Sequence, residues 1–187
     1  NNSKPYIGII HRLDRVTSGV LILAKKKSIL VAFNHLFSSR NVQKTYLAIV
    51  KNKPQNNKGN LVNFLVKNNK EKRADIVQSK SKDSLNCKLS YQVIGKNDVG
   101  YLLEIKPKTG RFHQIRAQLS TIGLPIIGDK KYGSDQKYLP LSICLHAWKL
   151  TYVAEGSKES QTFEAPLPKN NFWTFFFDYF LIFYLWI

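Results

Sequence analysis

Short runs of β-branched and aromatic residues dominate the hydrophobic pattern of this chain. The clearest run is KTYLAIV at 44–50, and VLILA at 20–24 has the composition of a buried strand. Weaker runs predict further strands at 61–66, 87–94, 101–105, 142–152 and 161–163. Strands outnumber helices and do not alternate regularly with them. The pattern therefore predicts an α+β fold, with a mixed, mostly antiparallel sheet and flanking helices.

Two segments have helical spacing instead. A helix is predicted to begin at Ser28 and to stop at Asn41, because one face of it collects Ile29, Phe33, Leu36 and Phe37. The second segment, TGRFHQIRAQLSTIG at 109–123, is predicted to become helical near Gly110 and to end at Gly123. The polar stretches at 51–60 and 128–135 are expected to be loop and turn, and 67–84 a mobile hairpin or loop.

The last sixteen residues, 172–187 (FWTFFFDYFLIFYLWI), carry a single charge at Asp178. A bilayer span needs about 20 apolar residues, so this run is too short. It is a buried or partner-covered segment, an interfacial anchor, or sequence foreign to the domain, such as frame-shifted read-through. We favour the first or the last of these. The expected organisation is one domain over 1–170 and an apolar aromatic tail of unknown origin at 171–187.

The chain has 187 residues and a net charge of +17, which favours a polyanionic partner such as nucleic acid. A lysine-rich composition produced by AT-rich coding explains the total charge equally well. Cys87 and Cys144 have no CxxC spacing and the histidines are scattered, so neither a metal site nor a disulfide framework is expected. A reducing, cytoplasmic location follows. The chain begins at Asn1 without a signal peptide and contains no Met, which suggests a fragment.

Candidate chemistry begins at HRLDRVTSG, residues 11–19, where Asp14 stands between Arg12 and Arg15. Only six of the 29 basic residues are Arg, and four of the six fall in two motif-like segments. Guanidinium groups bind carboxylates or phosphates with two hydrogen bonds, which lysine cannot do. Nearby cations favour the ionised form of Asp14, which suits nucleophilic or electrostatic work. An ordinary structural ion pair is the alternative.

The other arginine-bearing segment is 108–116. A helix starting near Gly110 would direct its free N–H groups toward an anion, with Lys108 and Arg111 beside it. His113 and Arg116, three residues apart, would share one helix face and look into the same cleft. The alternatives are a buried, hydrogen-bonded imidazole at His113 and a solvated charge at Arg116.

Several motifs together resemble one known family. In order along residues 11–168 they are HRLDRVTSG, KTYLAIV, KTGRFHQIRAQLSTIGLPIIGDKKYG, CLHAWKL and FEAPLP. This series is similar to that of the RluA-type family of RNA pseudouridine synthases. The resemblance implies an isomerase that converts specific uridines to pseudouridine in structured ribosomal or transfer RNA. It implies that no cofactor or metal is needed. We separately expect a monomer and no membrane partner.

The resemblance also implies roles for single residues. Asp14 matches the catalytic aspartate, acting on C1′ as a nucleophile or through a glycal-type route. Tyr46 matches the active-site tyrosine against the target base, and Arg116 the arginine that pairs with the aspartate. Because C1′ and C5 are inaccessible in a stacked base, the uridine must flip out. The resemblance also implies that Arg12 fills the place of the flipped base and that Leu145 packs on the uracil. Charge and helix position, and not the resemblance, predict contacts to the RNA backbone from Arg15, Lys108, Arg111 and His113, with solvated surface positions as the alternative.

Two features depart from the family pattern. The strand with an NKP-like motif that usually precedes HRLD is absent, which would leave a sheet edge or an apolar face uncovered. The tail after Trp173 also lies beyond the family pattern. Some family members carry an additional N-terminal S4 RNA-binding domain, and the sequence does not decide whether the parent protein has one. The rival hypotheses are a noncatalytic RNA-binding or ribosome-associated module and a membrane-surface protein anchored by 172–187.

Overall fold

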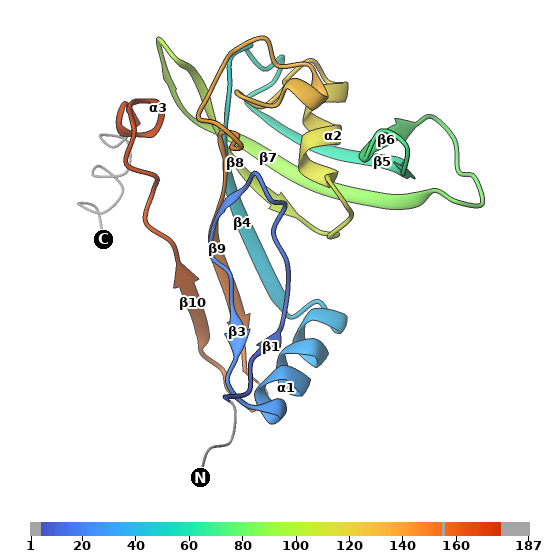
Figure 1. Cartoon of the computed structure of the whole chain (residues 1–187), viewed down its shortest axis with the longest axis vertical. Coiled ribbons are helices and arrows are strands. Elements are labelled where there is room, and N and C mark those ends of the chain that lie inside the picture. The colour runs from blue at the N-terminus through green and yellow to red at the C-terminus, as the bar shows by residue number, and fades with distance from the viewer. Residues whose placement is uncertain (1–4, 155, 177–187) are drawn as a thin grey trace.

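The structure is a computed structural model and describes residues 5–154 and 156–176. Strands form most of it (Figure 1). The elements are β1 (Gly8–Ile9), β2 (Ser18–Gly19), β3 (Leu23–Ala24), α1 (Lys27–Ser38), β4 (Val42–Val50), β5 (Lys58–Asn68), β6 (Arg73–Val77), β7 (Leu85–Asn97), β8 (Gly100–Pro107), α2 (Gln114–Thr121), the 3₁₀ turn η1 (Lys130–Tyr132), β9 (Leu145–Val153), β10 (Ser160–Glu164) and α3 (Asn171–Thr174).

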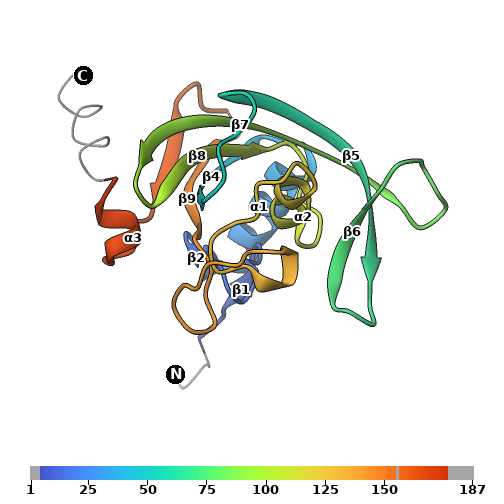
Figure 2. The same cartoon turned by 90° about the horizontal axis from the view of Figure 1, so that it is seen from above.

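One large sheet carries the fold. Its strands follow the order β10-β9-β4-β8-β7-β5-β6, all antiparallel to their neighbours, and β2 adds a short parallel pairing to β9. β1 and β3 form a separate antiparallel pair. The sheet curves, and α1 and α2 both lie beneath the arch that it makes in Figure 2. The predicted α+β fold with a mixed, mostly antiparallel sheet is confirmed.

The core is centred on β4. Its last four residues, 47–50, are fully buried because β8 flanks them on one side and β9 on the other for most of the strand. Leu102, Leu103 and Ile105 of β8 pack in the same cluster, together with Leu119 of α2. The run KTYLAIV thus belongs to a central strand. Lys44 and Tyr46, near its start, are only partly buried.

Most predicted elements are present, and most strands are longer than predicted, whereas β9 starts later than the predicted 142. The segment 67–84 contains β6 and forms a hairpin with β5. The buried strand predicted at 20–24 was wrong: Leu21 is 52% exposed, and only Leu23–Ala24 pairs there. The chain passes from β9 to the β1–β3 pair within this run, so it cannot form one continuous strand. In α1, Phe33 and Leu36 are buried as predicted, but Ile29 is exposed.

The first residues of the predicted tail are part of the core. Trp173 and Phe176 are fully buried, and the indole N–H of Trp173 donates to the Tyr138 hydroxyl at 3.0 Å. The Asn170 side chain caps α3 by accepting from the Phe172 N–H. Residues 177–187 lie outside the described part of the chain, so the hypotheses for them stay predictions. Within 5–154 and 156–176, no helix is long and apolar enough to cross a bilayer.

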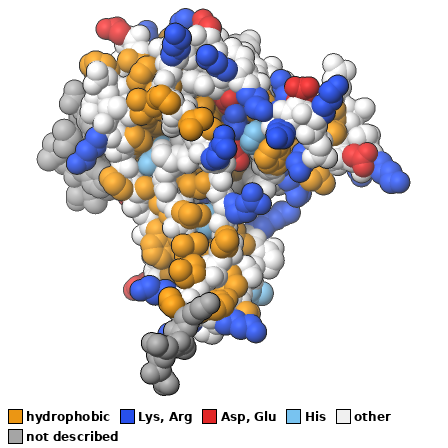
Figure 3. All heavy atoms as spheres, viewed as in Figure 1, with side chains coloured by type: hydrophobic (Ala, Val, Ile, Leu, Met, Phe, Trp, Pro, Cys, Tyr) orange, Lys and Arg blue, Asp and Glu red, His pale blue; other side chains and the backbone are white. Residues whose placement is uncertain are grey.

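An uncovered apolar face lies at the opposite end of the molecule. Ile7, Ile9, Leu21 and Leu23 in and beside β1 and β3 are between 47% and 67% exposed. Figure 3 shows hydrophobic side chains gathered over the lower half of the molecule, where these strands lie. An uncovered apolar face was predicted from the absent first strand. Its origin in that absence stays a prediction.

Removal of the Trp173 side chain tests whether residues 171–176 belong to the folded domain. We expect Trp173→Ala to lower the free energy of unfolding by about 3–5 kcal/mol, because it empties a fully buried site. Phe175→Ala is the matched control, since Phe175 is 60% exposed, and it should change stability by less than about 0.5 kcal/mol. Urea unfolding measures both. Equal stability of Trp173→Ala and the wild type would contradict the packing described.

Candidate active site

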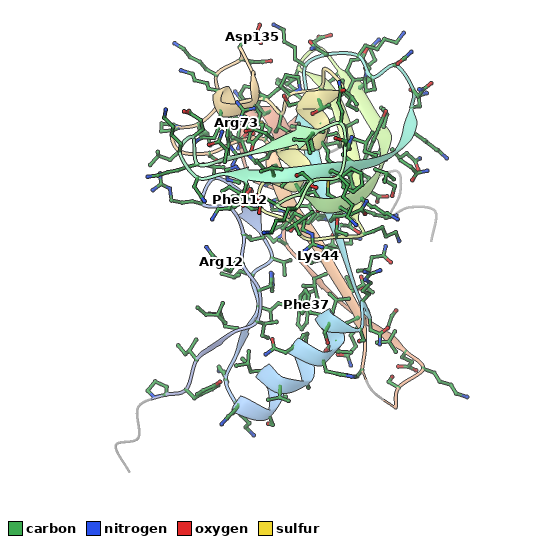
Figure 4. All side chains as sticks on the ribbon, turned by 90° about the vertical axis from the view of Figure 1, so that its right-hand side faces the viewer. Arg12, Phe37, Lys44, Arg73, Phe112 and Asp135 are labelled. Carbon is green, nitrogen blue, oxygen red and sulfur yellow. The ribbon has the colours of Figure 1, made fainter. Side chains whose placement is uncertain are left out.

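A cleft opens where the segment 11–17, the start of β4 and the loop before α2 meet. Seven of the nine predicted site residues line it: Arg12, Asp14, Tyr46, Arg111, His113, Arg116 and Leu145. The other two, Arg15 and Lys108, are exposed and do not line this cleft. Figure 4 looks toward this level of the molecule, with Arg12 and Lys44 between the upper sheet and α1. Residues from distant parts of the sequence therefore meet at one place.

The segment that carries Asp14 is held by its own backbone and by β9. The His11 ring accepts a hydrogen bond through Nε2 from the Ile22 N–H at 3.1 Å. This bond ties the start of the segment to the residues that follow Gly19. Burial, and secondly the charge of Lys44, lower the pKa of His11 to about 4, so its ring is neutral at pH 7. The Thr17 N–H donates to the Asp14 carbonyl at 2.9 Å, forming a tight turn.

Gly19 attaches this segment to the sheet. Gly19 pairs with Ala147 of β9 and has a φ of +119°, a conformation that side chains disfavour. A Cβ at this position would lie 2.2 Å from the Ala147 carbonyl oxygen. Beside it, Ser18 Oγ lies 2.9 Å from His146 Nδ1. The TSG of the motif therefore serves close contact with β9.

Asp14 faces Arg116 inside the cleft. Asp14 Oδ2 lies 3.6 Å from Arg116 Nη1 and 3.8 Å from His113 Nε2. The flanking Arg12 and Arg15 were predicted to favour the ionised form. Instead, burial raises the pKa of Asp14 and outweighs the opposing charge of Arg116 and, more weakly, of Arg12. The nearest cation to this carboxylate is therefore distant in sequence.

A second carboxylate holds Arg116 in place. Asp129, which is 1% exposed, accepts from Arg116 Nε at 2.7 Å and from Nη2 at 2.8 Å. The fork of the guanidinium is thus engaged by Asp129, and Nη1 remains for Asp14 and His113. Burial opposes the charge of Arg116, but the hydrogen bonds to Asp129 outweigh it and raise the pKa. The motif GDKKYG was interpreted as turn only, so this role of Asp129 was missed.

The His113 ring completes the support of Arg116. Its Nε2 lies 2.9 Å from Arg116 Nη1, and because a guanidinium only donates, Nε2 must accept. Nδ1 then carries the proton and donates to the Tyr132 hydroxyl at 3.0 Å, which also accepts from the Ala74 N–H. Burial, with the charge of Arg116 next, lowers the pKa of His113 to about 4. His113 is a neutral acceptor that orients Arg116.

Tyr46 shares the cleft with Asp14. Burial and the negative charge of Asp14 raise the pKa of the Tyr46 phenol to about 12. The phenol therefore keeps its proton at neutral pH. Leu145, at the start of β9, is buried and forms an apolar part of the same wall. The cleft thus combines one carboxylate, one protonated phenol, an apolar surface and several cations.

The helix predicted to start near Gly110 begins four residues later, at Gln114. The Gln114 side chain explains the delay, because its Oε1 accepts from the Arg111 N–H at 3.0 Å and from Thr109 Oγ1 at 2.7 Å. These bonds hold the preceding loop open, and His113 takes a left-handed conformation with φ of +51°. The predicted helix start near Gly110 is therefore wrong, and anion binding beside Gly110 stays a prediction.

Other cleft residues were not identified from the sequence. Lys44 lines the cleft two residues before Tyr46, and Thr17 lines it with a buried hydroxyl that has no hydrogen-bond partner within the described ranges. Tyr132 supports His113 from η1. Alternation along β4 could have placed Lys44 on the face of Tyr46, because strand residues two apart share a face. The contacts of Tyr132 arise only from tertiary packing.

Comparison with solved structures identifies the class of domain. The fold is similar to that of human RNA pseudouridylate synthase domain containing 1, with a TM-score of 0.75 and 27% sequence identity over 87% of this chain and 70% of that one. It is also similar to human RNA pseudouridylate synthase domain containing 4, with a TM-score of 0.73 and 26% identity over 94% of this chain and 75% of that one.

Sequence comparison agrees. Residues 1–121 match the RNA pseudouridylate synthase family. An uncharacterised RNA pseudouridine synthase of Zymomonas mobilis is 36% identical over 89% of this chain and 75% of its own length. The ribosomal large subunit pseudouridine synthases D of Borreliella burgdorferi and C of Escherichia coli are 33% and 32% identical over 91% and 88% of this chain. The chain spans about half the length of these two, 52% and 54%.

This chain belongs to the RNA pseudouridylate synthase family, whose reaction is an isomerisation. The predicted family resemblance is thereby confirmed. The roles of the individual site residues stay predictions, and the geometry above gives the means to test them.

Replacement of His113 by Gln tests its neutral state. Since the pKa of His113 falls from 6.5 to about 4 on folding, its contribution to stability is complete above pH 6.5 and is lost as the pH falls toward 4. We expect the wild type to lose up to about 3 kcal/mol more than His113→Gln between pH 7 and pH 4. Urea unfolding across this pH range measures the difference. His35→Gln, at an exposed position, should follow the wild type, and parallel curves for His113→Gln would contradict the assignment.

Proposed function

We propose that this chain is the catalytic part of an enzyme that isomerises specific uridines to pseudouridine in ribosomal RNA. The observation that carries the proposal is the meeting of Asp14, Tyr46 and Arg116 in one cleft of a pseudouridylate synthase fold. The names of the relatives favour large-subunit ribosomal RNA over transfer RNA. If the protein modified transfer RNA alone, the proposed substrate would be wrong, but the proposed reaction would be unchanged.

The reaction breaks the bond between C1′ and N1 of the uridine and forms one between C1′ and C5. The base rotates between the two steps, C5 loses its proton, and N1 gains one, so the atoms balance without a second substrate. In this proposal Asp14 supplies the anionic oxygen, either as a nucleophile at C1′ or through a glycal-type route. Both routes require the carboxylate form, and Arg116 at 3.6 Å supports that form against burial.

The remaining cleft residues serve the base and the backbone. Tyr46 keeps its proton, which suits it for packing against the flipped uracil and for donating a hydrogen bond. Leu145 contributes an apolar contact, and the exposed Arg12 at the rim reaches into the space that the flipped base leaves in the RNA. Arg111 lies at the same rim and faces phosphates. A monomer contains all of these groups, so we propose that it suffices.

The first test replaces Asp14 by Asn in the full-length protein. We expect pseudouridine formation to fall by at least about 10³-fold, equivalent to about 4 kcal/mol of transition-state stabilisation, while RNA affinity is largely kept. Asp135→Asn is the control, because this carboxylate is 79% exposed and pairs with the surface residue Lys51. The measurement is pseudouridine mapping of large-subunit ribosomal RNA. Normal turnover by Asp14→Asn would exclude the assigned role, and absent turnover by the wild type would favour a noncatalytic RNA-binding module.

The second test replaces Arg116 by Lys, which keeps the charge and removes the fork. An ammonium cannot bind Asp129 in two places and still face Asp14, so we expect turnover to fall by about 10²-fold or more. Single-turnover kinetics at saturating RNA separate this loss from a change in binding. Wild-type turnover by Arg116→Lys would show that the pair with Asp14 is only structural.

A further inference from the structure

Lys44 is a cation of the cleft that the proposed chemistry leaves unused. It lies on β4, two residues before Tyr46, and lines the cleft together with Arg12 and Arg111. Its Nζ is 5.2 Å from the centroid of the Phe37 ring at the end of α1. A Cβ added at Gly110 would lie 3.5 Å from this Nζ. The ammonium is therefore held between α1 and the loop that precedes α2.

This ammonium is without an acidic partner among residues 5–154 and 156–176, whose ion pairs all involve other cations. The contrast with two lysines on neighbouring strands is clear. Lys149 of β9 pairs with Glu164 at 3.1 Å, and Lys106 of β8 pairs with Glu104 at 2.8 Å. The Lys44 ammonium lies over the face of Phe37, and burial lowers the pKa of Lys44. An incoming anion would relieve this desolvated charge.

No side chain of the cleft can supply that anion. Asp14 is its acidic lining residue, and this carboxylate faces Arg116 and His113 instead. Arg12 is exposed at the same level of the molecule, and Figure 4 shows it and Lys44 on different segments, with Phe112 above them and Phe37 below. The two cations thus border the entrance to Asp14. The lining of the cleft thus leaves the Lys44 ammonium open to an anion from outside the described residues.

We propose that Lys44 binds a backbone phosphate of the RNA strand beside the target uridine, an inference that rests on the proposed function and extends it. A lysine binds phosphate as a point charge and needs no fixed fork, in keeping with its position over Phe37. Phosphate contacts set the register of a nucleic acid on its protein. Lys44 is accordingly a positioning residue, which places the ribose of the uridine over Asp14.

The test compares Lys44→Gln with Lys44→Arg in binding to a short single-stranded oligouridylate over a range of salt concentrations. The slope of log affinity against log salt is negative, and loss of one phosphate contact reduces its magnitude by about 0.7. Between 50 and 200 mM salt, wild-type affinity should therefore fall about 2.6-fold more than that of Lys44→Gln. Lys44→Arg keeps the charge and should keep the wild-type slope. Lys27→Gln is the matched control, because Lys27 is exposed at the far end of α1.

An unchanged slope in Lys44→Gln overturns the inference, whatever the pseudouridine assay shows. A second outcome also overturns the inference: a lower melting temperature of Lys44→Gln with an unchanged salt dependence of RNA affinity. In that case Lys44 serves only to fix α1 through Phe37. Pseudouridine mapping of large-subunit ribosomal RNA with the wild type tests the proposed function separately. A reduced slope together with an inactive wild type would keep the phosphate site and remove the proposed reaction.

Discussion

One guanidinium shared by two carboxylates is the interaction on which the site depends. Asp129 is buried and holds the fork of Arg116, and the remaining amino group faces Asp14. Breaking such a buried pair costs about 3–5 kcal/mol, because the charge left behind has no water to solvate it. Because the two hydrogen bonds to Asp129 already fix Arg116, its contact with Asp14 can be longer. At 3.6 Å, Asp14 is steadied by Arg116 without being neutralised by it.

Burial has a second effect on the same site, since it decides which groups carry charge. It raises the pKa of Asp14 and Tyr46 and lowers that of His113 and Lys44. A charged imidazole at His113 would oppose Arg116, so its low pKa keeps the arginine in place. The sheet produces this environment, because β4 brings its last four residues into the core while Lys44 and Tyr46 line the cleft. Fold and electrostatics therefore have a common origin in this strand.

Much of this was predictable from the sequence, and the failures have physical reasons. Runs of β-branched and aromatic residues identified β4, β7 and β8, because such residues pack well on the buried surface of a sheet. Motifs identified Asp14, Tyr46 and Arg116, which the structure brings together. The start of α2 was missed because the Gln114 side chain competes for the loop backbone, and Asp129 because its partner lies thirteen residues away on a different element. Backbone propensity describes neither a side chain that bonds the loop before its own helix nor a pair that joins two separate elements.

The close approach of Gly19 to Ala147 has a further consequence for how this protein tolerates substitution. The loop that carries Asp14 joins the sheet at Gly19. A methyl group added at Gly19 would collide with the main chain of β9. A substitution there would shift Asp14 away from its arginine although neither residue had changed. A substitution at Gly19 would thus reduce activity although Gly19 does not contact the nucleotide. Tolerance to mutation around the cleft therefore depends on the spacing of the backbone as well as on side-chain chemistry.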